Sequence, residues 1–182
     1  MKGFVFLVIV FIASNLVADS TTEVKNVILL KNGAKLEVIE DIFDAKKFNI
    51  EYRKDDSRII EYINGRIPYG VDFGTPKTYA KSIELYYKGK TYNLDSSDMY
   101  NALETKIPRP KQYSKLSVNH LFGIKCANEN NCVIRGILSQ GSSSFAVEWE
   151  ILNGKSRRTI MTFSKDIILF MLENIEPDVY LE

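Results

Sequence analysis

The chain has 182 residues, of which 45% are hydrophobic and 12% aromatic, and this is enough to bury the core of one domain. Lys2 is the only charged residue among the first 18, so the rest of the chain carries 23 basic side chains (24 minus Lys2) against 23 acidic ones. Proteins that bind nucleic acid or anionic membranes rely on a clustered excess of Lys and Arg. The balanced charge therefore argues against nucleic acid and against a membrane surface as partners.

Residues Met1–Ala18 differ from the rest of the chain, because Phe4–Val17 is an almost wholly apolar run of 14 residues. A helix that crosses a membrane needs about 20 such residues. A basic residue before the run and a small residue after it are typical of a secretory signal. We therefore predict a cleaved signal peptide over residues 1–18 and a single α+β domain over residues 19–182. The mature protein is then periplasmic or secreted, without stable membrane insertion; an uncleaved anchor is the alternative.

Six runs in the first half of the chain, either apolar with few interruptions or alternating between apolar and polar residues, predict strands. They are Val24–Leu30, Lys35–Phe43, Phe48–Tyr52, Ile59–Ile63, Lys81–Tyr87 and Lys90–Leu94. Asn32-Gly33 and Lys88-Gly89 lie between consecutive runs and predict two hairpin turns, since such turns favour positive φ. Asn64-Gly65 predicts a third hairpin, whose short return strand ends at Pro68. Two glycines and a proline in Tyr69–Pro76 predict a shaped loop within the same domain.

Two short helices are predicted, one in the middle of the chain and one near its end. Asp95–Asp98 supplies N-cap candidates ahead of Met99–Leu103, which we expect to form about two helical turns. Ser164 is an N-cap candidate for the second helix, in which apolar residues recur at every fourth position from Ile167 to Ile175. Such an amphipathic helix must pack on a sheet to bury its apolar side chains.

Strict alternation along Phe145–Ile151 predicts another strand, and the Asn-Gly dipeptide that follows predicts a hairpin turn. That turn sets a register in which Glu150 faces Arg157 and Trp149 faces Arg158. The first pair is an opposite-charge contact across the strands, and the second is a potential cation–π contact. The predicted fold is therefore α+β: about nine or ten mainly antiparallel strands with two short helices, the C-terminal one packed on the sheet.

Cys126 and Cys132 are the only cysteines and stand six positions apart. In an exported protein they are predicted to form a disulfide, which stabilises so short a loop by about 2–2.5 kcal/mol. A metal site would need further thiol or imidazole ligands, and His120 is the only histidine. We therefore predict no metal and no cofactor.

The loop that this disulfide closes is polar and too small to belong to a core. Its residues are the predicted contact surface for a partner: Ala127, Asn128, Glu129, Asn130 and Asn131. A rigid loop loses less entropy on docking, so the clamp favours recognition. A staple against fraying of the hairpin is the alternative role of the disulfide.

Candidate catalytic residues are few. His120 is a potential general base, but no serine lies in a nucleophile motif and both cysteines are expected to be oxidised. Asp95 and Asp98 lie one helical turn apart in the predicted cap, and either these two or Glu148 with Glu150 could act as acid and base. Helix capping and cross-strand ion pairing explain these carboxylates without chemistry. We therefore predict that the protein is not an enzyme.

Five of the ten tyrosines gather around one predicted hairpin and helix: Tyr79, Tyr86, Tyr87, Tyr92 and Tyr100. Tyrosine is enriched both in strands and at binding surfaces. These side chains are predicted to be ordinary strand and core aromatics, and a recognition face is the alternative.

Three passages of the chain are distinctive. They are Tyr69–Lys77 (YGVDFGTPK) with Tyr92–Glu104 (YNLDSSDMYNALE), the Cys126…Cys132 hairpin with Arg135-Gly136 and Phe145–Ile151 (FAVEWEI), and Arg157–Ile167 (RRTIMTFSKDI). Together they resemble a family of small exported bacterial proteins of unknown function. The resemblance implies export, and it brings no catalytic residue with it.

These observations predict an exported protein-binding domain whose partner is another protein in the cell envelope. Its sharpest form is an inhibitor or immunity protein that neutralises an envelope-acting toxin or enzyme, by analogy with other small exported bacterial domains. A small envelope hydrolase that uses Asp95, Asp98 or His120 is one alternative. A non-catalytic structural envelope protein is another.

Overall fold

A computed structural model describes residues 23–30, 33–103, 122–139 and 141–175. The predicted signal peptide and His120 lie outside the described residues. The strands are β1 (Val24–Leu29), β2 (Lys35–Ile42), β3 (Ile50–Tyr52), β4 (Ile60–Ile63), β5 (Thr78–Tyr87), β6 (Lys90–Leu94), β7 (Phe122–Asn128), β8 (Asn131–Leu138), β9 (Phe145–Leu152) and β10 (Lys155–Thr162). The helix is α1 (Lys165–Asn174), and short 3-10 turns cover Ala45–Lys47 and Gly141–Ser143.

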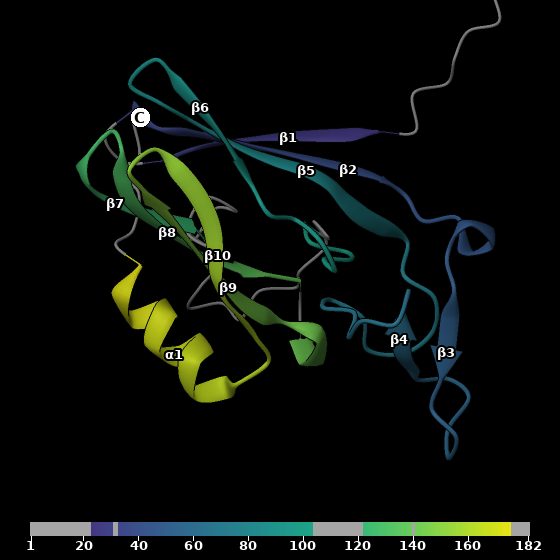
Figure 1. The fold of residues 1–182 in the computed structure, drawn as a ribbon. Coiled ribbons are helices and arrows are strands. Elements are labelled where there is room, and N and C mark those ends of the chain that lie inside the picture. The colour runs from purple at the N-terminus through teal and green to yellow at the C-terminus, as the bar shows by residue number, and fades with distance from the viewer. Residues whose placement is uncertain (1–22, 31–32, 104–121, 140, 176–182) are drawn as a thin grey trace, which may run out of the picture.

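The strands form two four-stranded antiparallel sheets and one small two-stranded sheet (Figure 1). The first sheet has the order β1-β2-β5-β6, the second has the order β10-β9-β8-β7, and β3 pairs with β4. The edge strands β6 and β10 contact each other, and the Ser156 hydroxyl donates to the Asn93 carbonyl oxygen there. The two large sheets therefore meet along one edge and enclose a common core.

The common core is built from the inward faces of both large sheets. Trp149, Phe122 and Phe145 are among its largest fully buried side chains. Trp149 donates its indole N–H to the Asp95 carbonyl oxygen over 2.9 Å, so the polar atom of the ring is satisfied. Every second side chain of β9, from Phe145 to Ile151, belongs to this core, which confirms the predicted alternation.

Helix α1 covers the outer face of the second sheet (Figure 1). Met171 and Ile175 are buried and pack against Ile137 and Ala146. Full burial of such a side chain contributes about 1.5–3 kcal/mol. The predicted C-terminal helix is therefore confirmed, although Ser164 at its N-cap makes no side-chain capping bond.

The predicted hairpins are confirmed in three places. Strands β1 and β2 pair with each other, and so do β5 and β6. Strands β9 and β10 pair in the predicted register, with Glu150 opposite Arg157 and Trp149 opposite Arg158. The mainly antiparallel character of the fold thus follows from local turn chemistry.

The helix predicted for Met99–Leu103 is wrong. Met99 and Tyr100 each form an isolated bridge with another part of the chain, so the segment is extended there. Asn101, in the middle of the predicted helix, has a φ of 44°, which a right-handed helix cannot hold. An extended chain sends neighbouring side chains to opposite sides, and Met99 accordingly enters the common core while Tyr100 enters a second, smaller cluster. Within the described residues α1 is the only α-helix, rather than one of two.

The return strand predicted after Asn64-Gly65 is also wrong. Ile63 and Arg66 form a single bridge there, and β4 pairs with β3 instead. The Asn64 side chain gives a physical reason, because its Oδ1 accepts from the Asn49 backbone N–H over 2.9 Å and ties the turn to the residue before β3. The chain then continues as the irregular loop predicted for Tyr69–Pro76.

Candidate functional site

The predicted disulfide between Cys126 and Cys132 is present, and it joins β7 to β8 where the two residues face each other. Cys132 is buried in the common core, and Cys126 packs against the same core. The bridge therefore lies on the inner side of the hairpin. It fixes the two strands immediately below their turn.

The predicted contact loop is shorter than expected. Ala127 and Asn128 continue β7, and Asn131 begins β8. Only Glu129 and Asn130 remain in the turn. Asn128 gives the reason: its side-chain oxygen accepts from the Asn130 backbone N–H and from the Asn131 side chain, each over 2.9 Å. This closure lets both strands continue as far as the turn.

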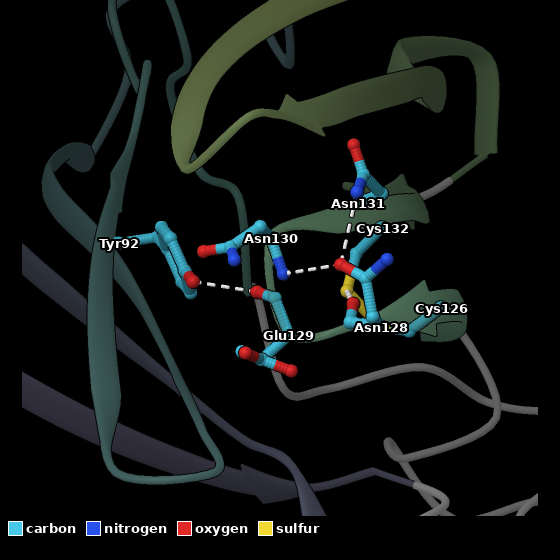
Figure 2. The surroundings of a disulfide bond; sticks show 7 residues. All are labelled: Tyr92, Cys126, Asn128, Glu129, Asn130, Asn131 and Cys132. Carbon is cyan, nitrogen blue, oxygen red and sulfur yellow. Dashed lines mark hydrogen bonds between the residues drawn. A yellow bond between two sulfur atoms is a disulfide. The ribbon is translucent and has the colours of Figure 1, made fainter.

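The Glu129-Asn130 turn is hydrogen-bonded to two other hairpins. Figure 2 shows the Tyr92 hydroxyl of β6 donating to the Glu129 carbonyl oxygen over 2.5 Å. Lys90 Nζ, also from β6, donates to Asn130 Oδ1 over 2.7 Å. Gly154, in the turn between β9 and β10, donates its backbone N–H to the Asn130 carbonyl oxygen over 3.1 Å. Two turns and the neighbouring strand β6 are therefore joined, so that three hairpins meet at one end of the molecule.

We call this surface the hairpin end. It comprises the turns Lys88-Gly89, Glu129-Asn130 and Asn153-Gly154 with the flanking residues Lys90, Leu152 and Lys155. Lys90 Nζ lies 3.9 Å from Glu129 and partly offsets its charge. Within the described residues neither Lys155 nor Lys88 forms an ion pair, and Lys88 lies over the ring of Tyr87. Three lysines against one glutamate make the surface basic, and Leu152 beside them is 46% exposed.

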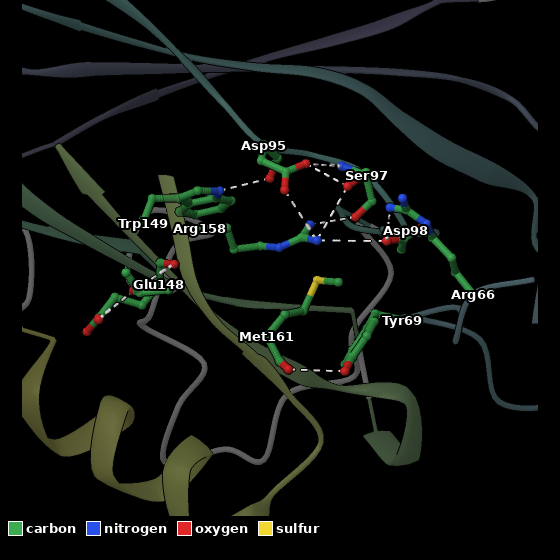
Figure 3. Close-up of polar contacts among 10 residues, drawn as sticks. Arg66, Tyr69, Asp95, Ser97, Asp98, Glu148, Trp149, Arg158 and Met161 are labelled. Carbon is green, nitrogen blue, oxygen red and sulfur yellow. Dashed lines mark hydrogen bonds and ion pairs between the residues drawn. The ribbon is translucent and has the colours of Figure 1, made fainter. Parts of the chain in front are cut away.

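A second charged group lies where β6 ends and the chain leaves the first sheet (Figure 3). We call Asp95–Asp98 the Asp95 loop. Asp95 Oδ1 accepts from the backbone N–H and the hydroxyl of Ser97 over 3.0 and 2.6 Å, which forms a tight turn. Arg158 reaches this turn from β10 and donates from Nη1 to the Ser97 carbonyl oxygen over 2.6 Å. Its Nη2 lies 3.3 Å from Asp95 Oδ2 and 3.8 Å from Asp98 Oδ2.

The Asp95 loop corrects two predictions. Asp95 was expected to cap a helix, and it caps its own turn because no helix follows. Arg158 was expected to form a cation–π contact with Trp149, but none is found between these two described residues. The guanidinium is directed instead at the carboxylates and at the Ser97 carbonyl (Figure 3). Ion pairs with hydrogen bonds are stronger than contacts with a ring.

The pKa of Asp95 bears on its chemistry. Burial raises this pKa, but the hydrogen bonds from Ser97 and the charges of Arg158 and Arg66 outweigh burial, and the pKa lies below its usual value of 3.8. A carboxyl group that is ionised at neutral pH has no proton to donate as a general acid. Asp98 faces the same Arg158 and also lies 3.3 Å from Arg66. The pair that the hydrolase alternative needs is therefore engaged in ion pairs.

A shallow hollow of about 450 Å³ adjoins the Asp95 loop, between the first half of β5 and the end of β6. Lys81 and Ser82 line one side, and residues 95–97 line the other. Lys81 is paired with Glu23, and Asp95 is paired with Arg158. No group of three or more His, Cys, Asp or Glu that could hold a metal occurs among the described residues. The charges of the hollow are thus already matched within the protein.

Glu148 and Glu150 are likewise held in ion pairs. Arg135 Nε donates to Glu148 Oε2 over 2.8 Å. Arg157 Nη2 donates to Glu150 Oε2 over 2.5 Å, which confirms the predicted cross-strand contact. Glu150 therefore has the structural role predicted for it, and Glu148 has a similar one that was not predicted.

The tyrosine cluster is mostly interior. Tyr87, Tyr92 and Tyr100 are 6%, 6% and 5% exposed, which confirms the core interpretation for these three. Burial raises the pKa of Tyr100 to about 12. Tyr86 is partly exposed, and its hydroxyl donates a hydrogen bond to the Glu84 carboxylate on the outer face of the first sheet.

Comparison with known proteins gives no relative for this chain: no family model, curated protein or solved structure matches it. The resemblance to small exported bacterial proteins stays a prediction. Among the described residues no helix has the length and apolar character needed to cross a membrane.

Proposed function

We propose that the mature chain is an exported domain that binds another protein of the cell envelope through its hairpin end, as an inhibitor or immunity protein. The observation that supports this most is the set of hydrogen bonds that joins three hairpins there. The five residues predicted from the sequence as the contact surface all belong to the β7–β8 hairpin that forms part of this end: Ala127, Asn128, Glu129, Asn130 and Asn131.

A preordered surface favours binding, because ordering contact residues on association costs about 0.5–1.5 kcal/mol for each mobile side chain. Tyr92 and Gly154 fix the carbonyl groups of Glu129 and Asn130. The disulfide fixes the two strands below them. Little conformational entropy is then left to lose when a partner docks on this turn.

Export also supports the proposal. A disulfide forms and persists in oxidising compartments such as the periplasm or the exterior, and Cys126 and Cys132 are paired here. We expect the exported protein to begin at Asp19, and intact-mass measurement decides this. Retention of Met1 in the exported protein would contradict both the predicted cleavage and the predicted compartment.

Binding without catalysis has its own test. Because Asp95 and Asp98 are engaged by Arg158, His120 is the remaining candidate for acid–base chemistry, and it lies outside the described residues. We expect His120→Ala to leave partner binding and function in the cell intact. Complete loss of function with an unchanged circular dichroism spectrum would favour the hydrolase alternative.

The binding role itself is tested with a photocrosslinking amino acid placed at Asn153, an exposed residue of the hairpin end. The same amino acid at Lys54, an exposed residue of the connection between β3 and β4, is the matched control. We expect irradiated cells to yield one dominant protein adduct from the Asn153 position and none from the Lys54 position. Equal adducts from both positions, or none from either, would overturn the proposal.

A further inference from the structure

We propose that the partner meets the hairpin end with an acidic protein surface, whose carboxylates pair with Lys88 and Lys155 and whose apolar side chains cover Leu152. This inference rests on the proposed binding function and specifies the chemistry of the partner at the same site.

The charges of Lys88 and Lys155 are not matched within the described part of the chain. Some exposed cations elsewhere have carboxylate partners, such as Arg157 with Glu150. Others, such as Lys46 and Lys125, are as unpaired within the described residues as Lys88 and Lys155, so it is the position of these two at the joined hairpins that sets them apart. Lys155 makes no ion pair, and Lys88 Nζ lies 5.4 Å from the centre of the Tyr87 ring. A carboxylate supplied from outside would therefore add a new ion pair instead of competing with an internal one.

The backbone that carries the two lysines is also well defined. Lys88 and Gly89 have φ values of 48° and 76°, and Asn153 and Gly154 have φ values of 51° and 76°. Positive φ at both central residues is the pattern of a type I′ hairpin turn, which has little conformational freedom. Both lysines therefore stand in or next to rigid turns.

Asn130 joins these two turns. Its side-chain oxygen accepts from Lys90, next to the first turn, and its carbonyl oxygen accepts from Gly154, in the second. Hydrogen bonds through Asn130 thus connect the two hairpins whose turns carry or adjoin Lys88 and Lys155. A fixed pair of cations selects a partner by the spacing of its carboxylates.

Leu152 gives this charged surface an apolar part. It is opposite Lys155 in the β9–β10 register and is 46% exposed. A single exposed leucine is ordinary, but protein interfaces combine an apolar centre with a polar rim. The lysines and Leu152 together have that composition.

Anionic lipid and nucleic acid would also attract lysines, but the charge distribution favours a protein. A lysine near an anionic membrane contributes about 1 kcal/mol, and Glu129 acts against the lysines beside it. Beyond residue 18 the chain has 23 basic and 23 acidic side chains, so no wider basic field supports binding to a polyanion. Two lysines on well-defined turns suit a few carboxylates on a folded protein surface better than the diffuse negative charge of a membrane or nucleic acid.

The test applies carbodiimide, which couples lysine amines to carboxylates in direct contact, to the complex captured through Asn153. We expect peptides in which Lys88 or Lys155 is coupled to an Asp or Glu of the captured protein. We expect Lys88→Gln with Lys155→Gln to reduce adduct yield about tenfold, because two ion pairs are lost. Lys46→Gln with Lys47→Gln, which removes the same charge from exposed positions elsewhere, should leave the yield unchanged.

Each result separates the two proposals. Capture of no partner at Asn153 overturns the proposed function and this inference together. Capture with coupling only through other lysines, or an unchanged yield from the Lys88 and Lys155 variant, overturns the inference alone. Sedimentation of the wild-type protein with phosphatidylglycerol vesicles, lost in the same variant, would assign the lysines to a lipid and also overturn it.

Discussion

The hairpin end and the Asp95 loop are both turns rich in charged side chains, yet they use their charges in opposite ways. In the Asp95 loop, Asp95 and Asp98 share the guanidinium of Arg158. At the hairpin end, Lys88 and Lys155 have no carboxylate partner among the described residues. The backbone of the hairpin end is nevertheless held by hydrogen bonds between neighbouring hairpins.

The difference separates charges that stabilise the fold from charges that are available to a partner. Arg158 crosses from β10 to the loop after β6, so its bonds join the adjoining edges of the two large sheets. Its side chain is only 16% exposed. Removing it would leave Asp95 without its ion-pair partner and the Ser97 carbonyl without its donor, whereas removing an exposed and unpaired lysine changes stability little.

The largest loss of stability is expected for Arg158→Ala, because Asp95 then loses its paired cation, Asp98 keeps only Arg66, and the Ser97 carbonyl loses its donor. A loss of about 2–3 kcal/mol is expected in urea-induced unfolding. Arg157→Ala is the matched control, since the neighbouring Arg157 is exposed and pairs with Glu150 on the outer face. Its loss should be about 0.2–1 kcal/mol. Equal losses for the two variants would contradict the distinction.

Removal of the disulfide ranks next. Cys126→Ala with Cys132→Ala should lower the free energy of unfolding by about 2 kcal/mol, because a short closed loop no longer restricts the unfolded chain. Dithiothreitol should lower the wild-type protein to the same level and leave the double variant unaffected. If the double variant equals the oxidised wild type in stability, the hairpin end does not depend on this bridge.

Tyr92→Phe tests the joining of turns at the hairpin end. It leaves the Glu129 carbonyl without its donor and should cost about 1 kcal/mol. Hydrogen exchange at Gly154, whose amide bonds to the same turn, should become faster. Tyr52→Phe is the control, because Tyr52 is 46% exposed and its hydroxyl has no partner among the described residues. Equal exchange rates in wild type and Tyr92→Phe would show that the turns are not coupled.

The smallest effect is the pH dependence of the Asp95 loop. The folded-state pKa of Asp95 lies below 3.8, so the unfolded chain takes up a proton before the folded one does as the pH falls. The stability that this carboxylate contributes is present above the unfolded pKa and is lost as the pH falls through the folded pKa. Thermal unfolding should therefore show Asp95→Asn furthest below wild type at neutral pH, with the gap closing in acid. A gap that widens in acid would contradict the lowered pKa of Asp95 in the folded protein.

Local patterns predicted the features that depend on neighbouring residues. The register that sets Glu150 opposite Arg157 follows from an Asn-Gly turn between them, and it is confirmed. The same reasoning failed at Met99–Leu103. Burial of Met99 and Tyr100 in two separate apolar clusters, with a positive φ at Asn101, outweighs a weak helix preference.

The candidate site was predicted only in part. The Cys126–Cys132 bridge follows from two cysteines in an exported chain, and it is present. The partners of the turn do not follow from any local pattern, since Tyr92 and Glu129 are 37 positions apart. Arg158 and Ser97 are 61 positions apart, so their bond likewise arises only when the two sheets meet.

The most direct test of the account measures partner capture and the free energy of unfolding together, in two variants. Lys88→Gln with Lys155→Gln should lose capture about tenfold while its stability stays within about 0.5 kcal/mol of wild type. Arg158→Ala should lose about 2–3 kcal/mol of stability and, where it is folded, capture the partner as well as wild type does. Full capture by the lysine variant, or lost capture by folded Arg158→Ala, would contradict the account.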